Sequence, residues 1–110
     1  MESRVIFGAD VAWQPAGENV TRKVLAHLTQ EMVVEVRFAQ GSEGAPHRHP
    51  HTQCTYVKCG AFDFTIEGET FRVQEGDTLA FAPNELHGCR CLEQGVLIDV
   101  FTPMREDFIR

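Results

Sequence analysis

The stretch "PHRHPHTQ", residues 46–53, places a histidine at every second position. His47, His49 and His51 share one parity, and Gln53 follows on the same parity. Successive side chains of a β-strand point to opposite faces, so a strand here would direct all four side chains to one side. Neutral imidazole is a common metal ligand. The pattern therefore suggests a metal site built from one face of an extended segment.

Short β-type segments separated by turn residues surround this stretch. We expect strands at 32–38, at 47–59 up to Gly60, at 78–83 and at 95–101, a hairpin over 61–73 that turns at Gly68, and loops at 40–46 and 74–77. Turn signals about every ten residues are typical of an all-β sandwich or barrel. Residues 19–32 fit a short helix or a pair of strands, and the β character of the remainder favours strands. The last segment, 104–110, predicts a single helical turn.

Composition limits the classes of partner. The 110 residues suit one domain, 1–110, and 43% are hydrophobic. Sixteen acidic residues against ten basic ones give a net charge of −6, which argues against nucleic-acid binding. No apolar run is long enough to span a bilayer, so we expect no membrane partner.

The first residues lack the features of a secretion signal, so we expect a cytoplasmic protein. Its four cysteines, Cys54, Cys59, Cys89 and Cys91, are then expected to be reduced, buried thiols. Trp13, the sole tryptophan, is expected to anchor the N-terminal arm by packing.

A fourth histidine occurs in "EGDTLAFAPNELHG", residues 75–88, where a predicted strand runs into a proline-led turn and then His87. A strand returning through that turn can bring His87 beside the first cluster. The two stretches resemble the two sequence motifs of the cupin family. The matching residues are Gly41, His47, His49, Gln53 and Gly60 in the first motif, and Gly76, Asp77, Pro83 and His87 in the second. The resemblance implies a double-stranded β-helix, a jelly-roll barrel, with a metal ion in its mouth.

Gln53 stands where the cupin motif usually has an acidic ligand. An amide oxygen can coordinate an ion without adding negative charge, which would leave the full charge of the ion to act on an anionic, oxygen-rich substrate. Alternatively, Gln53 only hydrogen-bonds a ligand or the backbone. His51 follows Pro50, which removes a ladder donor, so we expect His51 at the rim of the site rather than on the ion.

The closing segment, "GVLIDVFTPMREDF" (95–108), is similar to that of the pectin-degradation proteins called KdgF. That resemblance implies that His47, His49, Gln53 and His87 hold one divalent transition metal ion, and that Asp99, Phe101 and Arg105 line the substrate site. The implied activity is the ring-opening isomerisation of 4,5-unsaturated monouronates, from pectin or alginate breakdown, to 5-keto-4-deoxyuronates.

The residue types suit that chemistry. Asp99 would transfer a proton between oxygen and carbon. Arg105 would bind the substrate carboxylate as a bidentate fork, and Phe101 would form an apolar wall against the unsaturated ring. Taken alone, Asp99 fits a solvated strand position, Phe101 fits the core, and Arg105 fits an ion pair with Glu106 or Asp107.

Two other functions remain open from the sequence. One is a three-histidine cupin dioxygenase that holds iron, and the other is a non-catalytic, metal-dependent sugar-binding cupin. The donor set suits Zn, Ni, Mn or Fe. The partner expected is a small anionic sugar, and by analogy with other cupins we expect a homodimer.

Overall fold

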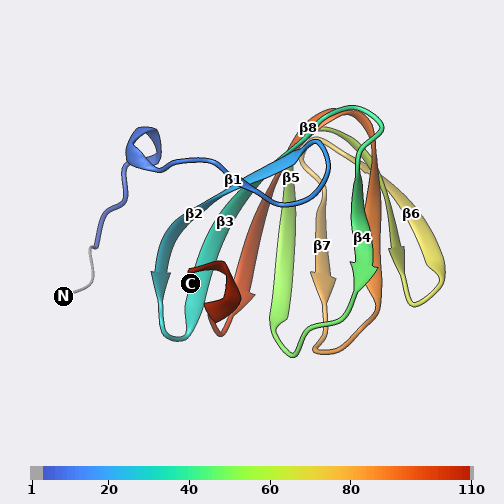
Figure 1. The fold of residues 1–110 in the computed structure, drawn as a ribbon. Helices are drawn as coiled ribbons and strands as arrows, with labels where there is room; N and C mark the ends of the chain where they lie inside the picture. The colour runs from blue at the N-terminus through green and yellow to red at the C-terminus, as the bar shows by residue number, and fades with distance from the viewer. Residues whose placement is uncertain (1–3, 110) are drawn as a thin grey trace.

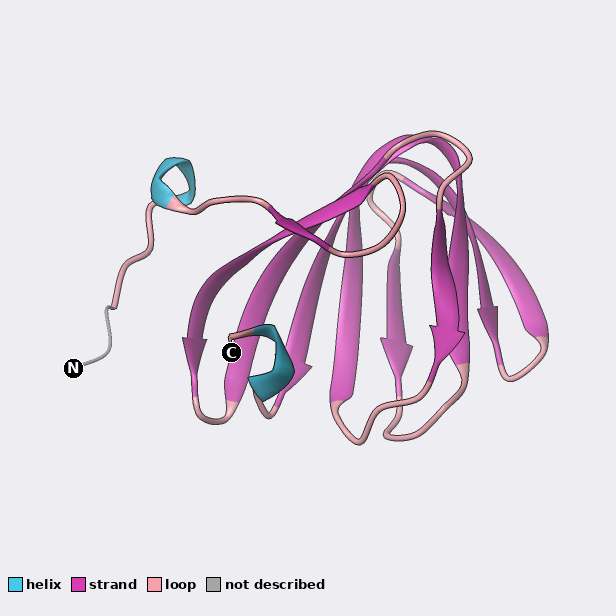
Figure 2. Cartoon of the chain, in the orientation of Figure 1, coloured by secondary structure: helices cyan, strands magenta, loops and turns pink. Residues whose placement is uncertain are grey.

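The computed structural model describes residues 4–109, and nearly all of its regular structure is antiparallel β-sheet (Figures 1 and 2). The elements are η1 (Gly8–Asp10), β1 (Gln14–Pro15), β2 (Val20–Leu28), β3 (Glu31–Phe38), β4 (Glu43–His47), β5 (Thr52–Ile66), β6 (Glu69–Gln74), β7 (Thr78–Phe81), β8 (His87–Thr102) and η2 (Glu106–Phe108), where η marks a single 3-10 turn. The strand order is β1-β2-β3-β8-β5-β6, with β4 paired to β8 and β7 paired to β5. The predicted all-β barrel is confirmed.

The two long strands β5 and β8 bend together and join the two halves of the barrel. Their ladder shifts register between Val57 and Phe62, which marks the bend. Gly60 has φ +85°, and a Cβ there would lie 2.5 Å from the Cα of Gly95, so the backbones cross without room for a side chain. The prediction that Gly60 ends its strand is wrong, because the glycine allows β5 to bend and continue.

Strand pairing aligns the inward-facing residues into rows that cross the barrel. In β3, buried and less buried residues alternate, and Met32, Val34, Val36 and Phe38 face inward. Three of these rows continue across β8 to β5: Met32 pairs with Phe101, which pairs with Gln53; Val34 pairs with Asp99, which pairs with Thr55; and Val36 pairs with Leu97, which pairs with Val57. The rows containing Gln53, Thr55 and Asp99 therefore put polar groups among buried apolar ones.

Several predicted boundaries hold and others shift. The hairpin turn at Gly68 is confirmed, with Glu67 and Gly68 both at positive φ, as tight hairpins require. Residues 19–32 form strands, as favoured. The loop predicted over 40–46 is wrong in its second half, which belongs to β4, and β8 begins at His87 rather than at residue 95.

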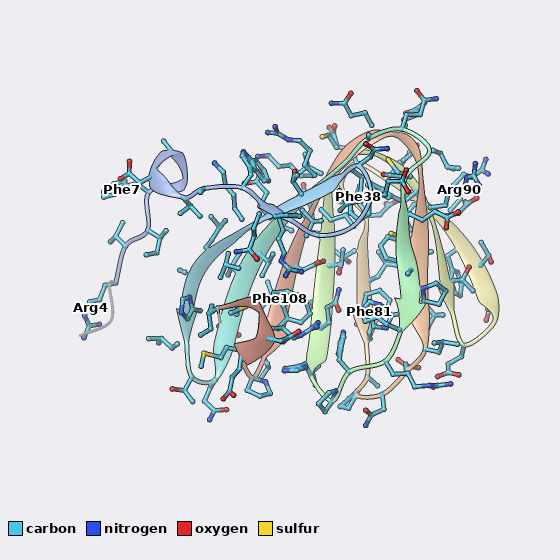
Figure 3. The ribbon with its side chains drawn as sticks, viewed as in Figure 1. Arg4, Phe7, Phe38, Phe81, Arg90 and Phe108 are labelled. Carbon is cyan, nitrogen blue, oxygen red and sulfur yellow. The ribbon has the colours of Figure 1, made fainter. Side chains whose placement is uncertain are left out.

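The N-terminal arm lies outside the barrel wall, whereas Phe108 of the C-terminal turn packs against the core. The N-terminal arm extends away from the strands, with Phe7 exposed (Figure 3). Trp13 anchors the arm, as expected, by packing against Arg37 and Lys23, whose charged groups lie 4.3 and 4.7 Å from the ring centroid. The predicted C-terminal turn is confirmed as η2, although Arg110 lies outside the described residues.

The cysteines correct one expectation. All four are free, and Cys91 is buried, but Cys54 is exposed on the outer face of β5 and is not the buried thiol that was predicted. Within the described part of the chain, no helix has the length and apolar character needed to cross a membrane.

Candidate metal centre

The histidine stretch is not one strand. His47 ends β4, His49 and His51 lie in the loop that follows, and Gln53 belongs to β5. The prediction of a continuous strand over 47–59 is wrong, because the proline in this stretch cannot donate to a ladder and the chain turns there. The carbonyl of His49 instead accepts a hydrogen bond from the backbone N–H of Asn84, at 2.8 Å.

The turn nevertheless brings the predicted histidines together. His47, His49 and His87 each offer one nitrogen, and these three atoms lie within 4.8 Å of one another. His47 and His87 are register partners where β4 meets β8. His51 is outside this group, although its ring centroid lies 5.5 Å from that of His49.

Each of the three rings is oriented by its own backbone. The Nδ1 atom lies within hydrogen-bond distance of a carbonyl two residues away in the chain: His47 with Ala45 at 2.9 Å, His49 with His51 at 3.1 Å, and His87 with Glu85 at 2.9 Å. With Nδ1 as the donor, each neutral ring keeps a lone pair on Nε2. The ring of Phe81 stacks on His87 at 4.3 Å and further limits its rotation.

Gln53 is oriented by a hydrogen-bond chain that begins at Asp99. The Thr55 hydroxyl donates to Asp99 Oδ1 at 2.6 Å, and Gln53 Nε2 donates to Thr55 Oγ1 at 2.9 Å. With Asp99 ionised, this chain has only one direction, because a carboxylate can only accept. The amide oxygen of Gln53 must then point away from Thr55.

That oxygen meets the ring of His49. Gln53 Oε1 lies 2.8 Å from His49 Nε2, and both residues are buried. If Nδ1 carries the ring proton, two lone pairs face each other here, an arrangement that a shared cation would stabilise. His87 Nε2 is buried and has no hydrogen-bond partner within residues 4–109. Three imidazoles and an amide oxygen thus form a donor set that fits a divalent transition metal ion.

Burial shapes the charge states around this centre. Burial lowers the pKa of His49 and His87, which favours the neutral rings that bind metals. Burial raises the pKa of the Asp99 carboxyl to about 6, although hydrogen bonds from Thr55 and Gln53 act to lower it.

A cavity of about 190 Å³ opens beside the histidines. The three residues predicted for the substrate site, Asp99, Phe101 and Arg105, all line it, and so does Leu97, the parity neighbour of Asp99. The Arg105 fork is already engaged: Nε and Nη2 donate to the two carboxylate oxygens of Asp107 at 3.1 and 2.9 Å. Arg105 also lies over the rings of Phe101 and Phe108.

Sequence reasoning missed two residues of this site: Arg22, which lines the cavity, and Thr55, which is buried behind it and hydrogen-bonds Gln53 and Asp99. Thr55 has the parity of Gln53 and Val57, and Arg22 has the parity of Val20 and Val24. The alternation of both strands can be seen in the sequence. It does not show whether a polar residue faces the barrel interior or water until the pairing of the strands is known.

The sequence and the fold both match known proteins. The family model described as "Cupin domain" matches residues 34–101. Among curated proteins, the pectin degradation protein KdgF of Dickeya dadantii (strain 3937) is 40% identical over 108 residues, covering 96% of this chain and 98% of that protein.

Two solved structures share the fold over nearly the whole chain. KdgF from Halomonas sp. superposes with a TM-score of 0.91 at 35% identity, covering 96% of this chain and 98% of that one. An RmlC-like cupin from Shewanella frigidimarina NCIMB 400 superposes with a TM-score of 0.92 at 34% identity, covering 96% of each chain.

Proposed function

The chain belongs to the cupin family and, within it, to the KdgF proteins, and from this premise we propose that it is a metal-dependent isomerase that opens the ring of 4,5-unsaturated monouronates. The observation that carries the proposal is the cavity in which Asp99, Phe101 and Arg105 meet His47 and His87, two of the three clustered histidines. At about 190 Å³ it is smaller than the 300–1,000 Å³ pockets that hold drug-sized ligands, and this size favours a monosaccharide.

The reaction rearranges one molecule without a redox change. The C1–O5 bond of the cyclic hemiacetal breaks, the proton of the C1 hydroxyl leaves, and the C5 oxygen becomes an enol. C4 then gains a proton as the enol becomes a ketone. Atoms and electrons balance within the sugar, so the reaction needs only proton transfer and stabilisation of charge on oxygen.

The donor set His47, His49, Gln53 and His87 would hold the divalent ion, which as a Lewis acid would polarise an oxygen of the sugar. Asp99 is the proton carrier, because its carboxylate is the one that lines the cavity. The Thr55 hydroxyl donates to one of its oxygens at 2.6 Å and holds the carboxylate in place.

Phe101 supplies an apolar surface in the same cavity and also holds the site together. Its ring centroid lies 5.7 Å from that of His49, in an edge-to-face arrangement. Arg105, over Phe101 at 5.1 Å, brings positive charge to the wall of the cavity and favours an anionic sugar.

The test is a time course on purified unsaturated galacturonate monosaccharide, followed by the loss of ultraviolet absorbance of the conjugated enol. We expect wild-type protein to accelerate the decay at the same rate with and without oxygen, and Asp99→Asn to abolish the acceleration. The matched control, Arg72→Gln, changes an exposed residue on β6 and should behave as wild type. Decay that is equally fast without protein would refute the proposal, and a strict need for oxygen would favour a dioxygenase.

We propose in addition that the protein acts in the cytoplasm as a homodimer. The free thiols support a reducing compartment. Sedimentation analysis of the purified chain tests the dimer, and a monomer at micromolar concentration would contradict it.

A further inference from the structure

Arg22 is a charged residue in an inward-facing row. It lies on β2 opposite Val36, which is opposite Leu97 on β8, which in turn is opposite Val57 on β5. The three partners are buried and apolar, and Arg22 lines the same cavity as Val36 and Leu97. A guanidinium placed on such a row costs desolvation energy unless something compensates the charge.

The compensation that the protein supplies is incomplete. Arg22 Nε donates to Gln14 Oε1 at 2.9 Å, and the guanidinium carbon lies 3.7 Å from the ring centroid of Phe108. Among the described residues, 4–109, Nη1 and Nη2 make no hydrogen bond. Burial and the neighbouring charge of Arg105 lower the pKa of Arg22, and the opposing effect of the Asp107 carboxylate does not cancel them, so a bound anion would further stabilise the positive charge.

The positive charge of Arg105 is compensated more fully than that of Arg22. Two of its five N–H groups, on Nε and Nη2, already donate to the carboxylate of Asp107, so its charge is paired within the protein. Both guanidinium groups lie over Phe108, with Arg105 at 4.3 Å from its centroid, and this ring on η2 lines the cavity together with them. A planar carboxylate is bound by two parallel donors, and Arg22 offers such a pair on Nη1 and Nη2 with no carboxylate of the protein hydrogen-bonded to it, whereas Arg105 already holds Asp107.

We propose that Arg22 makes the bidentate contact with the carboxylate of the sugar, and that Arg105, fixed by Asp107 and Phe108, adds charge from beside it. This inference rests on the proposed function and names the residue that selects its anionic substrate class. The carboxylate would then sit near β2, with the reacting carbons toward Asp99 and the histidines.

The first experiment compares Arg22→Gln with the matched surface control Arg72→Gln in steady-state kinetics on the unsaturated uronate. We expect Arg22→Gln to raise KM about 10- to 100-fold, the range for loss of hydrogen bonds to a charged group, and to leave kcat within about threefold. The control should match wild type. A KM unchanged in Arg22→Gln would overturn the proposal.

The second experiment needs no turnover and so separates this inference from the proposed function. Binding of galacturonate and of its C6 amide, which is neutral, is measured by calorimetry. Wild type should prefer the acid about tenfold or more, and Arg22→Gln should bind the two equally. If wild type binds with this preference but does not open the unsaturated ring, the proposed isomerase fails and the role of Arg22 stands.

Two further variants decide between a direct contact and a structural role. Arg22→Lys keeps the charge without the fork and should show an intermediate preference, which also settles the case if Arg22→Gln fails to fold. Arg22→Ala should regain part of its preference for the acid when guanidinium ion is added, which a merely structural residue would not permit. Loss of preference in Arg105→Gln but not in Arg22→Gln would assign the contact to Arg105 and overturn the proposal.

Discussion

Replacement of Asp99 by asparagine should stabilise the metal-free protein at high pH and not at low pH. Burial raises the pKa of this carboxyl from 3.8 to about 6 in the folded protein. A carboxyl whose pKa is higher in the folded state binds its proton more tightly there. Its contribution to stability is therefore complete below about pH 4 and is lost as the pH rises through 6.

The magnitude follows from that difference. The rise in the pKa of Asp99 from 3.8 to about 6 corresponds to about 3 kcal/mol lost from the free energy of unfolding at pH 8. Asparagine carries no charge and so avoids this loss, and its amide oxygen can still accept from Thr55. Its NH2 group needs a new partner, however, which reduces the gain to about 1–3 kcal/mol. In a domain of this size 2 kcal/mol corresponds to roughly 10 °C in Tm.

The assay is thermal unfolding of chelator-treated protein between pH 4.5 and pH 8, with wild type and variant compared at each pH. We expect the Tm of Asp99→Asn to exceed that of wild type at pH 8, and the gap to close toward pH 4.5. Asp63→Asn removes a carboxylate that pairs with Arg72 outside the cavity and controls for net charge. A gap of the same size at both ends of the pH range would refute the reasoning, as would a less stable Asp99→Asn at pH 8.

Three other predictions test the donor set and the frame that holds it. Thr55→Val keeps the shape of the side chain but leaves Gln53 Nε2 and Asp99 Oδ1 without their shared hydrogen-bond partner. We therefore expect about 2–4 kcal/mol of destabilisation in urea unfolding and a 10- to 100-fold weaker affinity for zinc in a competition titration. A zinc affinity equal to that of wild type would contradict the orienting role of Thr55. Gly60→Ala should lower the free energy of unfolding in urea by more than about 3 kcal/mol, because the added Cβ would lie 2.5 Å from the backbone of Gly95. Gly68→Ala has the same φ of +85° but open space around it, and should lower the free energy of unfolding by only about 1–2 kcal/mol. Equal losses would mean that the backbone crossing with Gly95 can relax. Removal of bound metal by a chelator should lower Tm and readdition should restore it, whereas His87→Ala should show neither change, as differential scanning fluorimetry would report.

The sequence predicted the type of fold correctly but placed several strand boundaries wrongly. Alternation in Met32–Phe38 and the turn at Gly68 are local signals, and the structure confirms both. The bend at Gly60 was misjudged because its cause is the backbone of Gly95, thirty-five residues away in the chain. A glycine that ends a strand and a glycine that lets two strands cross are the same in the sequence.

The site shows the same limit. Histidine spacing together with the resemblance to the two cupin motifs was sufficient to group His47, His49 and His87, although the strand assumed to carry the first two is in fact a strand end and a loop. Thr55 and Arg22 were missed because their importance comes from partners on other strands: Asp99 across the ladder for Thr55, and the buried row of Val36 for Arg22. Alternation identifies which residues share a face, and only register identifies which residues meet.

Register also explains why position 53 is an amide rather than a carboxylate. Gln53 has two tasks on opposite sides: its oxygen faces His49 Nε2 at 2.8 Å, and its NH2 group donates to Thr55 at 2.9 Å. A glutamate could perform the first task but not the second, because a carboxylate has no proton to donate. Thr55, with one proton, would then face acceptors at both position 53 and Asp99. One of the two carboxylates would lose its hydrogen bond, and the second negative charge would raise the pKa of Asp99 further. The neutral amide thus keeps Asp99 fixed while it leaves the charge of a bound cation undiminished for the substrate.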